Sequence, residues 1–256
     1  MPVVLNESDV YREFAPPAWA RGSIACFWVR RGDGGSVRVL PDACTDIVWR
    51  AGAGSVIAGP DSEAWISRTM PGELVLGARL LPGAGGAVFG IPLAELQNTR
   101  VPVGALGLDP WVAPADGLDL NASAAAFARH TLRLLATTRP DPAVQASVAR
   151  LLDPHQRVDA LAAALGFSER QLRRRFLAAV GYGPKTLQRV LRLRRFLAGV
   201  GVTPVRGPSL GPSGLDAGFD GLAGAAAAAG YADQAHLARE CRALTGLTPG
   251  QLADSR

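Results

Sequence analysis

The sequence predicts an α+β protein. We expect an N-terminal small β-barrel or sandwich domain at residues 1–105 and a linker with one helix at residues 106–140. An all-α domain with two helix-turn-helix units joined by a long helix is expected at residues 141–256. Three observations predict this arrangement. Short β-branched and aromatic runs alternate with glycine turns in the first part, apolar residues recur at helical spacing in the last part, and a block within that last part is repeated.

The first part favours strands. Residues 24–30 (IACFWVR) predict one strand, and the glycine-rich stretch at residues 32–35 followed by residues 37–40 predicts that it closes a hairpin. Residues 46–50 and 55–58 predict a second pair around another glycine turn. Short strands at this spacing are typical of a small barrel or sandwich. The remaining candidates are strands at residues 64–69, 73–81 and 86–91 and a helical turn at residues 92–96.

The linker begins as an irregular stretch over residues 106–120. Asn121 or Ser123 is expected to cap a helix that ends at Ala136, and a proline-rich break then precedes a further helix at residues 143–152. The packed face of the linker helix is expected to carry Phe127, Leu132 and Leu135.

Residues 158–180 predict two short helices around a tight turn. Gly166 allows a turn in which a side chain would clash, and Ser168 is a good N-cap for the second helix. Leu172, Phe176 and Val180 follow one another at helical spacing, so they form the buried face. The side chains left to project outward are Arg170, Arg173, Arg174 and Arg175. This is the layout of a helix-turn-helix, whose second helix presents side chains to the DNA major groove.

Charge supports this interpretation. The chain carries a formal net charge of +5, and residues 140–256 hold 15 basic and 9 acidic side chains against 12 and 13 in residues 1–139. Between Ser168 and Arg195 the single acid is Glu169. A basic run alone is compatible with an ordinary solvated face. Here the one-sided excess coincides with a turn between two amphipathic helices, which favours nucleic acid as a partner.

The stretch LGFSERQLRRRF, followed by VGYGPK, resembles the first helix-turn-helix of the AraC/XylS family of transcription regulators. Residues 225–237 (AAAAAGYADQAHL) resemble a second copy, and residues 245–249 match residues 180–184, so units are expected at about 158–180 and 222–244. The resemblance covers about residues 141–253. It implies a bacterial, sequence-specific regulator that binds double-stranded DNA, with neither enzymatic activity nor a cofactor. RNA polymerase is a further partner candidate.

The resemblance implies how DNA contacts are divided. A rigid helix at residues 184–197 holds the two recognition helices about one DNA turn, ~34 Å, apart. Base contacts map onto Arg170, Arg173 and Arg174 in the first unit and onto Gln234, Ala235, Ala238 and Arg239 in the second. Arginine suits guanine and glutamine suits adenine. Phosphate contacts map onto Arg175, Lys185, Arg189 and Arg192. Arg194 or Arg195 either joins these or covers apolar surface with its stem.

The N-terminal part resembles, through PDACTDIVW and GARLLPGAGGAVFGIPLAEL, the compact β domain of one branch of that family, over roughly residues 10–105. Such a domain is expected to bind a small effector or to form a homodimer. Its candidate effector residues are Cys26, Trp28, Asp42, Cys44, Asp46, Trp49 and Arg79. The alternatives are that the tryptophans belong to the core and that the two aspartates shape the turn at Pro41.

Other classes of protein fit less well. A metal-dependent barrel oxygenase needs clustered histidine ligands, and the three histidines, His130, His155 and His236, all lie outside the β region. A thiol-based redox-sensing regulator using Cys26 and Cys44 stays open as the alternative, as does an architectural DNA binder. Cys241 is expected to be a small core residue rather than a metal ligand. The first residues show no signal peptide and no run long enough to span a membrane, so we expect a cytoplasmic protein.

Overall fold

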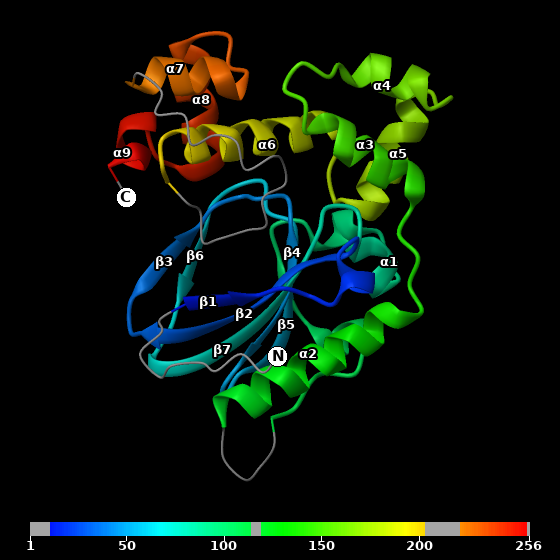
Figure 1. The fold of residues 1–256 in the computed structure, drawn as a ribbon, viewed down its shortest axis with the longest axis vertical. Coiled ribbons are helices and arrows are strands. Elements are labelled where there is room, and N and C mark those ends of the chain that lie inside the picture. The colour runs from blue at the N-terminus through cyan, green and yellow to red at the C-terminus, as the bar shows by residue number, and fades with distance from the viewer. Residues whose placement is uncertain (1–10, 114–118, 203–220, 255–256) are drawn as a thin grey trace.

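The computed structural model describes residues 11–113, 119–202 and 221–254. An N-terminal antiparallel β-sheet domain is followed by a helical region that lies against one end of the sheet (Figure 1). The predicted α+β fold class is therefore confirmed.

Within the described residues the main sheet has six antiparallel strands in the order β1-β2-β7-β4-β5-β8, and a smaller sheet pairs β3 with β6. The main sheet is open, because β1 and β8 do not pair with each other. The strands are β1 Tyr11–Phe14, β2 Ile24–Asp33, β3 Ser36–Val39, β4 Thr45–Arg50, β5 Gly54–Ala58, β6 Trp65–Arg68, β7 Pro71–Leu80 and β8 Arg100–Pro102.

The predicted hairpin between residues 24–30 and 37–40 is wrong. β2 pairs with β7, and β3 pairs with β6, so Asp33 faces Pro71 before the glycine-rich stretch and Ser36 faces Arg68 after it. The chain bends there rather than reversing. We call the two paired chains, β2–β3 and β6–β7, the β ribbon. The bend is tight, since a Cβ atom on Gly32 would lie 2.4 Å from the carbonyl oxygen of Met70.

The predicted strand at residues 86–91 is also wrong, because this stretch forms helix α1, Gly85–Phe89. A short apolar run carries no periodicity that separates a strand from a helix. Here Val88 and Phe89 are buried side by side in the β-domain core, as a helix end allows. The helical turn expected next is confirmed as a 3₁₀ segment, Leu93–Leu96.

The linker helix α2, Leu120–Ala136, packs along the sheet (Figure 1). Phe127 and Leu135 are buried in the β-domain core, and Trp111 contacts both Trp49 and Phe127 edge to face. The N-cap of α2 is Asp119 rather than Asn121 or Ser123, since the Asp119 carboxylate accepts a hydrogen bond from the Asn121 amide. Aspartate caps as well as asparagine or serine, so composition alone did not locate this helix start.

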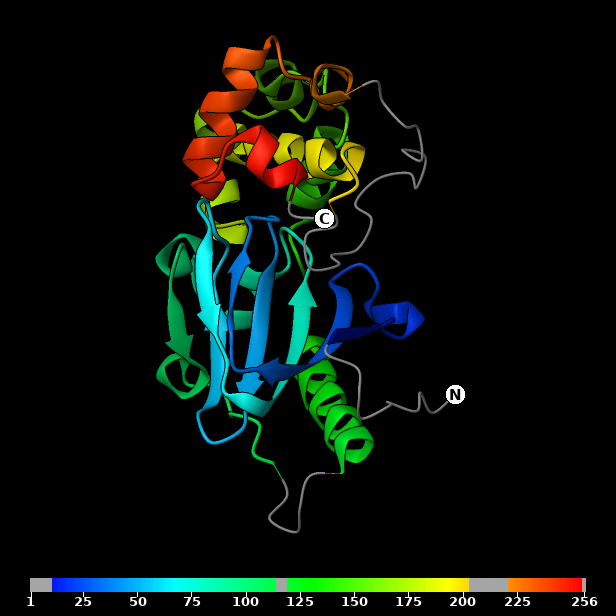
Figure 2. The same cartoon turned by 90° about the vertical axis from the view of Figure 1, so that its left-hand side faces the viewer.

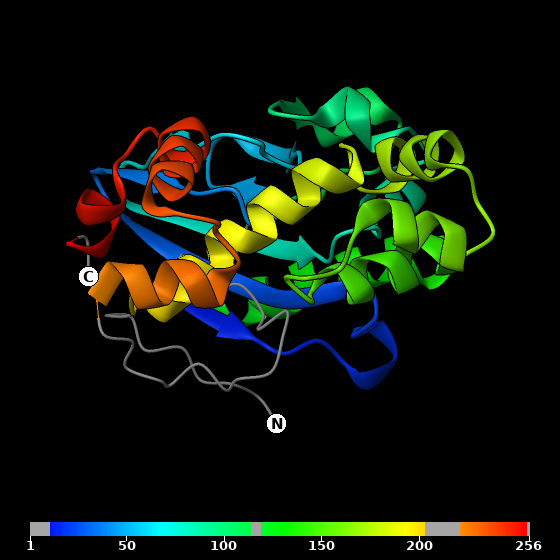
Figure 3. The same ribbon diagram turned by 90° about the horizontal axis from the view of Figure 1, so that it is seen from above.

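The helical region is arranged around the long helix α6, Pro184–Gly199. Seen from above, α6 crosses the top of the β domain with one helix pair at each end (Figure 3). The loop predicted over residues 200–220 lies largely outside the described residues. The other helices are α3 Pro142–Leu151, α4 Val158–Ala164, α5 Glu169–Ala179, α7 Gly221–Ala229, α8 Gln234–Thr245 and α9 Pro249–Ala253. None of the described helices combines the length and apolarity that a membrane crossing requires.

The helical region and the β domain each have a hydrophobic core, and the helices lie over one end of the sheet (Figure 2). We call the boundary between these two parts the seam. Ala43, in the loop between β3 and β4, belongs to the core of the helical region together with Val144 and Leu187. Helix α5 lies against α1 and the 3₁₀ segment that follows it. The β domain therefore sits directly beneath the helices whose sequence suggested DNA binding.

Candidate nucleic-acid interface

Helix α5 separates an apolar face from a basic one. Ser168 begins it with a capping box, in which the hydroxyl accepts from the Gln171 amide and the Gln171 side chain accepts from the Ser168 amide. Leu172, Phe176 and Val180 are fully buried, as their spacing predicted. The guanidinium groups of Arg170, Arg173 and Arg174 are exposed and make no hydrogen bond or ion pair with the described residues. These three side chains are free to meet a ligand.

Arg175 has a partner within the chain. Its guanidinium pairs with the carboxylate of Asp141, the N-cap of α3, and lies 4.7 Å from the centre of the Phe167 ring. The side chain is still 42% exposed. Arg175 therefore ties α5 to α3, a use that its sequence context did not suggest.

The second unit repeats the turn of the first. Gly166 and Gly230 both have positive φ, at 70° and 88°. In the first turn the Phe167 amide donates to the Ala162 carbonyl at 3.0 Å, and in the second the Tyr231 amide donates to the Ala226 carbonyl at 3.0 Å. These matched bonds support the internal duplication inferred from the sequence.

The two turns differ by one residue. Up to Tyr231 the matching positions are 64 apart, whereas the N-caps Ser168 and Asp233 are 65 apart. The offset of 65 then holds from Leu172 and Leu237 to the glycines that end the helices, Gly181 and Gly246. Ala232 is the extra residue of the second turn.

Helix α8 presents a less basic surface than α5. Gln234, Ala235 and Arg239 are exposed, and Ala238 is half-buried. Leu237 and Cys241 are buried, so Cys241 occupies the core position that Phe176 holds in the first unit. Sequence reasoning missed Arg242, which is exposed one turn after Arg239 on the same face. The spacing of these two arginines was the signal that could have found it.

The predicted phosphate contacts on α6 divide into two groups. Lys185 is exposed near the start of the helix. Arg189 and Arg192 instead turn to Glu240 of α8, at 2.6 Å and 3.3 Å from its carboxylate oxygens. The Arg192 guanidinium also lies 5.4 Å from the Tyr231 ring centre. These contacts hold α8 against α6, and Glu240 was not singled out by the sequence.

Arg194 and Arg195, left open between phosphate contact and packing, both bind carbonyl groups within the chain. Arg194 donates to the carbonyl oxygen of Asp42 at 3.1 Å. Arg195 donates to the carbonyls of Leu152 and Ala229, which lie at the ends of α3 and α7. Arg195 therefore connects α3 and α7 across α6.

Part of the candidate effector set does come together in the β domain. Cys26, Arg79 and Asp46 are direct cross-strand neighbours on β2, β7 and β4, so their side chains share one face of the sheet. The Arg79 guanidinium lies 3.3 Å from Asp46 and 3.6 Å from Asp42. Trp28 donates to Asp46 at 2.8 Å. Glu13, 3.6 Å from Arg79, belongs to the same cluster and was missed.

This cluster is a buried ion-pair network rather than an empty pocket. Arg79 is only 5% exposed and is surrounded by its carboxylate partners. Burial raises the pKa of Asp46, and the neighbouring Arg79 opposes that shift. Trp49 is not part of it, because it points to the opposite face and packs on Trp111.

Both cysteines of the β domain are buried. Burial raises the pKa of the Cys26 thiol to about 12 and raises the pKa of the Cys44 thiol well above its ordinary value. The thiolate is the reactive form of cysteine, so these positions are chemically quiet near neutral pH. Within the described residues, no three His, Cys, Asp or Glu side chains are arranged so that they could hold one metal ion.

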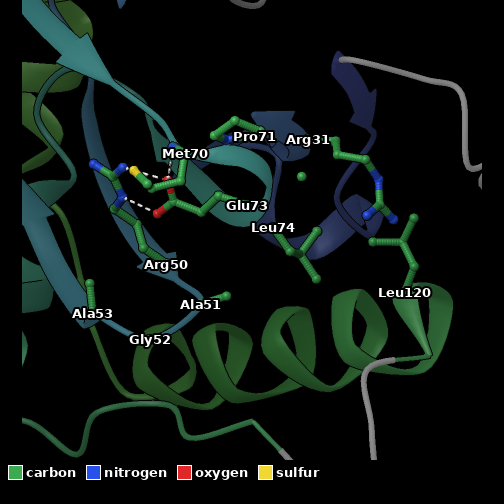
Figure 4. Close-up of a pocket in the computed structure, with 11 residues that line it drawn as sticks. Arg31, Arg50, Ala51, Gly52, Ala53, Met70, Pro71, Glu73, Leu74 and Leu120 are labelled. Atoms are coloured by element: carbon green, nitrogen blue, oxygen red, sulfur yellow. Dashed lines mark hydrogen bonds and ion pairs between the residues drawn. The ribbon is translucent and has the colours of Figure 1, made fainter. Parts of the chain in front are cut away.

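The β domain has an open hollow of about 680 Å³ at a different place, where the bend of the β ribbon meets the β4–β5 turn and the start of α2 (Figure 4). Arg50 and Glu73 form a bidentate ion pair on one wall. The Arg50 Nε and Nη2 atoms each lie 2.8 Å from an oxygen of the Glu73 carboxylate. Arg31 lies on the other side, next to Leu120, and makes no ion pair with the described residues. The sequence did not mark these residues.

A family model described as a domain of unknown function (DUF6597) matches residues 12–102. The match runs from β1 to β8 and so covers the β-sheet domain, while the helical region lies outside it. Comparisons with curated proteins and with solved structures found no match. The match gives the β domain a family description that carries no activity.

Proposed function

We propose that this chain is a sequence-specific, DNA-binding transcription regulator of the AraC/XylS type. Helices α5 and α8 enter successive major grooves of one duplex, and α6 holds them at a fixed separation. The β domain regulates this binding through a small effector or by forming a homodimer.

One observation carries the proposal. Two helical pairs with the same turn geometry lie at opposite ends of a single long helix (Figure 1), and both second helices expose an arginine at one matching position, Arg174 and Arg239. A solvated surface helix has no need of this repetition. Matched recognition helices held by a common spacer are what reading two grooves requires.

Within the proposal, base reading belongs to Arg170, Arg173 and Arg174 on α5 and to Gln234 and Arg239 on α8. We assign phosphate contacts to Lys185, which is exposed near the start of α6, and to Arg242, which is exposed on α8. Arg175, Arg189 and Arg192 contribute charge near the duplex, but their ion pairs with Asp141 and Glu240 give them a structural role first.

Binding-site selection with the full chain tests the proposal. Wild type should enrich a bipartite motif, and Arg170→Ala should lose about 1–3 kcal/mol of binding free energy at that motif and blur one base position. Arg150→Ala, which removes an exposed arginine of α3, is the matched control and should keep the motif. Enrichment of no motif by wild type would refute the proposal, and a motif unchanged by Arg170→Ala would refute this assignment.

The effector part of the proposal centres on the hollow beside Arg31. The Arg31 guanidinium, which has no ion-pair partner among the described residues, and the apolar side chains of Leu74 and Leu120 suit a small organic acid with an apolar body. A thermal-shift screen of such acids should give stabilising compounds whose effect Arg31→Ala removes and Arg21→Ala, an exposed arginine elsewhere, retains. Equal shifts in both variants would contradict this site.

The thiol-sensor alternative loses support from the burial and the raised pKa values of Cys26 and Cys44. The architectural alternative predicts DNA binding without base preference, so the selection experiment separates it from the proposal directly.

A further inference from the structure

The β domain contacts both recognition helices, and in each case the contact is at the C-terminal end of the helix. A glycine with positive φ follows each recognition helix: Gly181 comes after Val180, the C-cap of α5, and Gly246 comes after Thr245, the last residue of α8. These pairs match at the offset of 65 residues. Each of them touches a different part of the β domain, which therefore spans the gap between the two units.

At the end of α5 the contact is close packing. A Cβ atom on Gly86 of α1 would lie 2.2 Å from the carbonyl oxygen of Ala178, and one on Gly181 would lie 2.4 Å from the ring of Pro60. Atoms do not approach so closely, so only glycine fits at these positions without movement. The first recognition helix is thereby fixed against the β domain by its backbone.

At the end of α8 the contact is one charged hydrogen bond. Arg38, on β3 of the β ribbon, donates from Nη1 to the carbonyl oxygen of Thr245 at 3.0 Å. The same nitrogen lies 3.4 Å from the position that a Cβ atom on Gly246 would take. The last carbonyls of a helix carry partial negative charge and have no partner within the helix, so a guanidinium is suited to this position.

The β domain is also anchored midway between these two ends. Arg194 of α6 donates to the carbonyl oxygen of Asp42, and the Asp42 carboxylate accepts from the Cys44 amide at 2.9 Å and lies near Arg79. Ala43, between them, has a positive φ of 71° and is buried in the helical core. This loop is therefore held in one shape from both sides.

We propose that Arg38 is a positioning residue for DNA reading, and that the β domain, together with α6, sets the distance and angle between the two recognition helices. This rests on the proposed function. Helix α5 packs closely on the β domain, whereas the end of α8 is held to the same domain by the hydrogen bond from Arg38. Removing Arg38 frees the end of α8 while leaving every base-reading side chain in place.

The consequence for DNA is a change in spacing tolerance. One base pair moves the second half of a site by about 3.4 Å along the duplex and turns it by about 35°. A pair of helices at fixed separation cannot follow such a shift, but a loosened one can. Arg38 should therefore affect which spacings are accepted and not which bases are read.

The test uses the full chain and the bipartite motif selected by wild type. Duplexes with one base pair inserted or removed between the two halves are titrated against wild type, Arg38→Ala, Arg38→Lys and Arg68→Ala. Wild type should lose about tenfold or more in affinity at the altered spacings, equal to about 1.4 kcal/mol. Arg38→Ala should lose only about twofold to threefold, and Arg38→Lys, which keeps a cationic donor, should lie between them.

Arg68→Ala is the matched control. It removes an exposed arginine from the same two-stranded sheet, whose side chain makes no hydrogen bond or ion pair with the described residues, and should keep the wild-type spacing penalty. A wild-type penalty in Arg38→Ala, in a variant that melts at the wild-type temperature, would overturn the inference while leaving DNA binding intact. Failure of wild type to select any motif would overturn the proposed function itself.

Discussion

At the scale of single residues, Glu240 gives two basic side chains of α6 a role within the protein. Arg189 and Arg192 have the spacing and charge of phosphate contacts, yet both point to this one carboxylate. Their partner lies 51 and 48 residues further along the chain, so no local pattern could reveal it. The sequence does predict the exposed positions of Arg170, Arg173 and Arg174, because the face that a helical residue occupies depends only on its spacing from nearby apolar residues.

We predict that Glu240→Gln weakens the hold of α6 on α8. The carboxylate is 11% exposed and Arg192 is 18% exposed, so losing the charge leaves a partly buried guanidinium with poorer partners. Arg189 is 40% exposed and regains water, which limits the loss. Urea unfolding should show a loss of about 1–3 kcal/mol.

The control for this prediction is Glu63→Gln, which neutralises an exposed carboxylate of the β domain and should change stability by less than about 0.5 kcal/mol. Equal stabilities of the two variants would show that Glu240 contributes no more than a surface charge.

At the scale of elements, helices were predicted more accurately than strand pairings. The start of a helix can be predicted from residues within it or next to it. Examples are the capping box at Ser168 and Gln171 and the proline at the start of α6. Strand pairing depends on residues far along the chain. Nothing within residues 24–40 indicates that β2 and β3 continue as one ribbon against β7 and β6, so the glycine-rich bend was interpreted as a hairpin turn.

The candidate sites follow the same rule. The sequence could predict in part which face of the sheet carries Cys26, Asp46 and Arg79, because successive side chains of a strand point to opposite faces. Their pairing across three strands, and the fourth partner Glu13, required the register of the sheet. The hollow beside Arg31 depends on a bend, a turn and a helix start that are distant in sequence, so it had no sequence signal.

At the scale of the whole molecule, the seam between the β domain and the helical region is built from contacts too close to permit a side chain. Gly86 and Gly181 lie there, and Ala43 reaches across into the helical core. Because the seam is packed rather than merely polar, we expect the two parts to unfold together.

We predict that Gly86→Ala destabilises the chain, although alanine favours helices over glycine by about 1 kcal/mol. The added Cβ would lie 2.2 Å from the Ala178 carbonyl oxygen, and separating α1 from α5 should cost about 1–3 kcal/mol in the free energy of unfolding. Calorimetry of the variant should show a lower melting temperature. Gly104→Ala, whose Cβ would meet nothing within 4 Å, should melt at or above the wild-type temperature. A stabilised Gly86→Ala would mean that the seam is loose.

The extra residue in the second turn, Ala232, sets the rule for exchanging specificity between the two units. A graft counted from the turn glycines, Gly166 and Gly230, would transfer each side chain to a neighbouring site, turned by about 100° around the helix axis. It would point a reading arginine at the protein instead of the groove. Counted from the caps, Arg170 corresponds to Ala235 and Arg173 to Ala238, and it is in that frame that a swapped recognition surface would face outward.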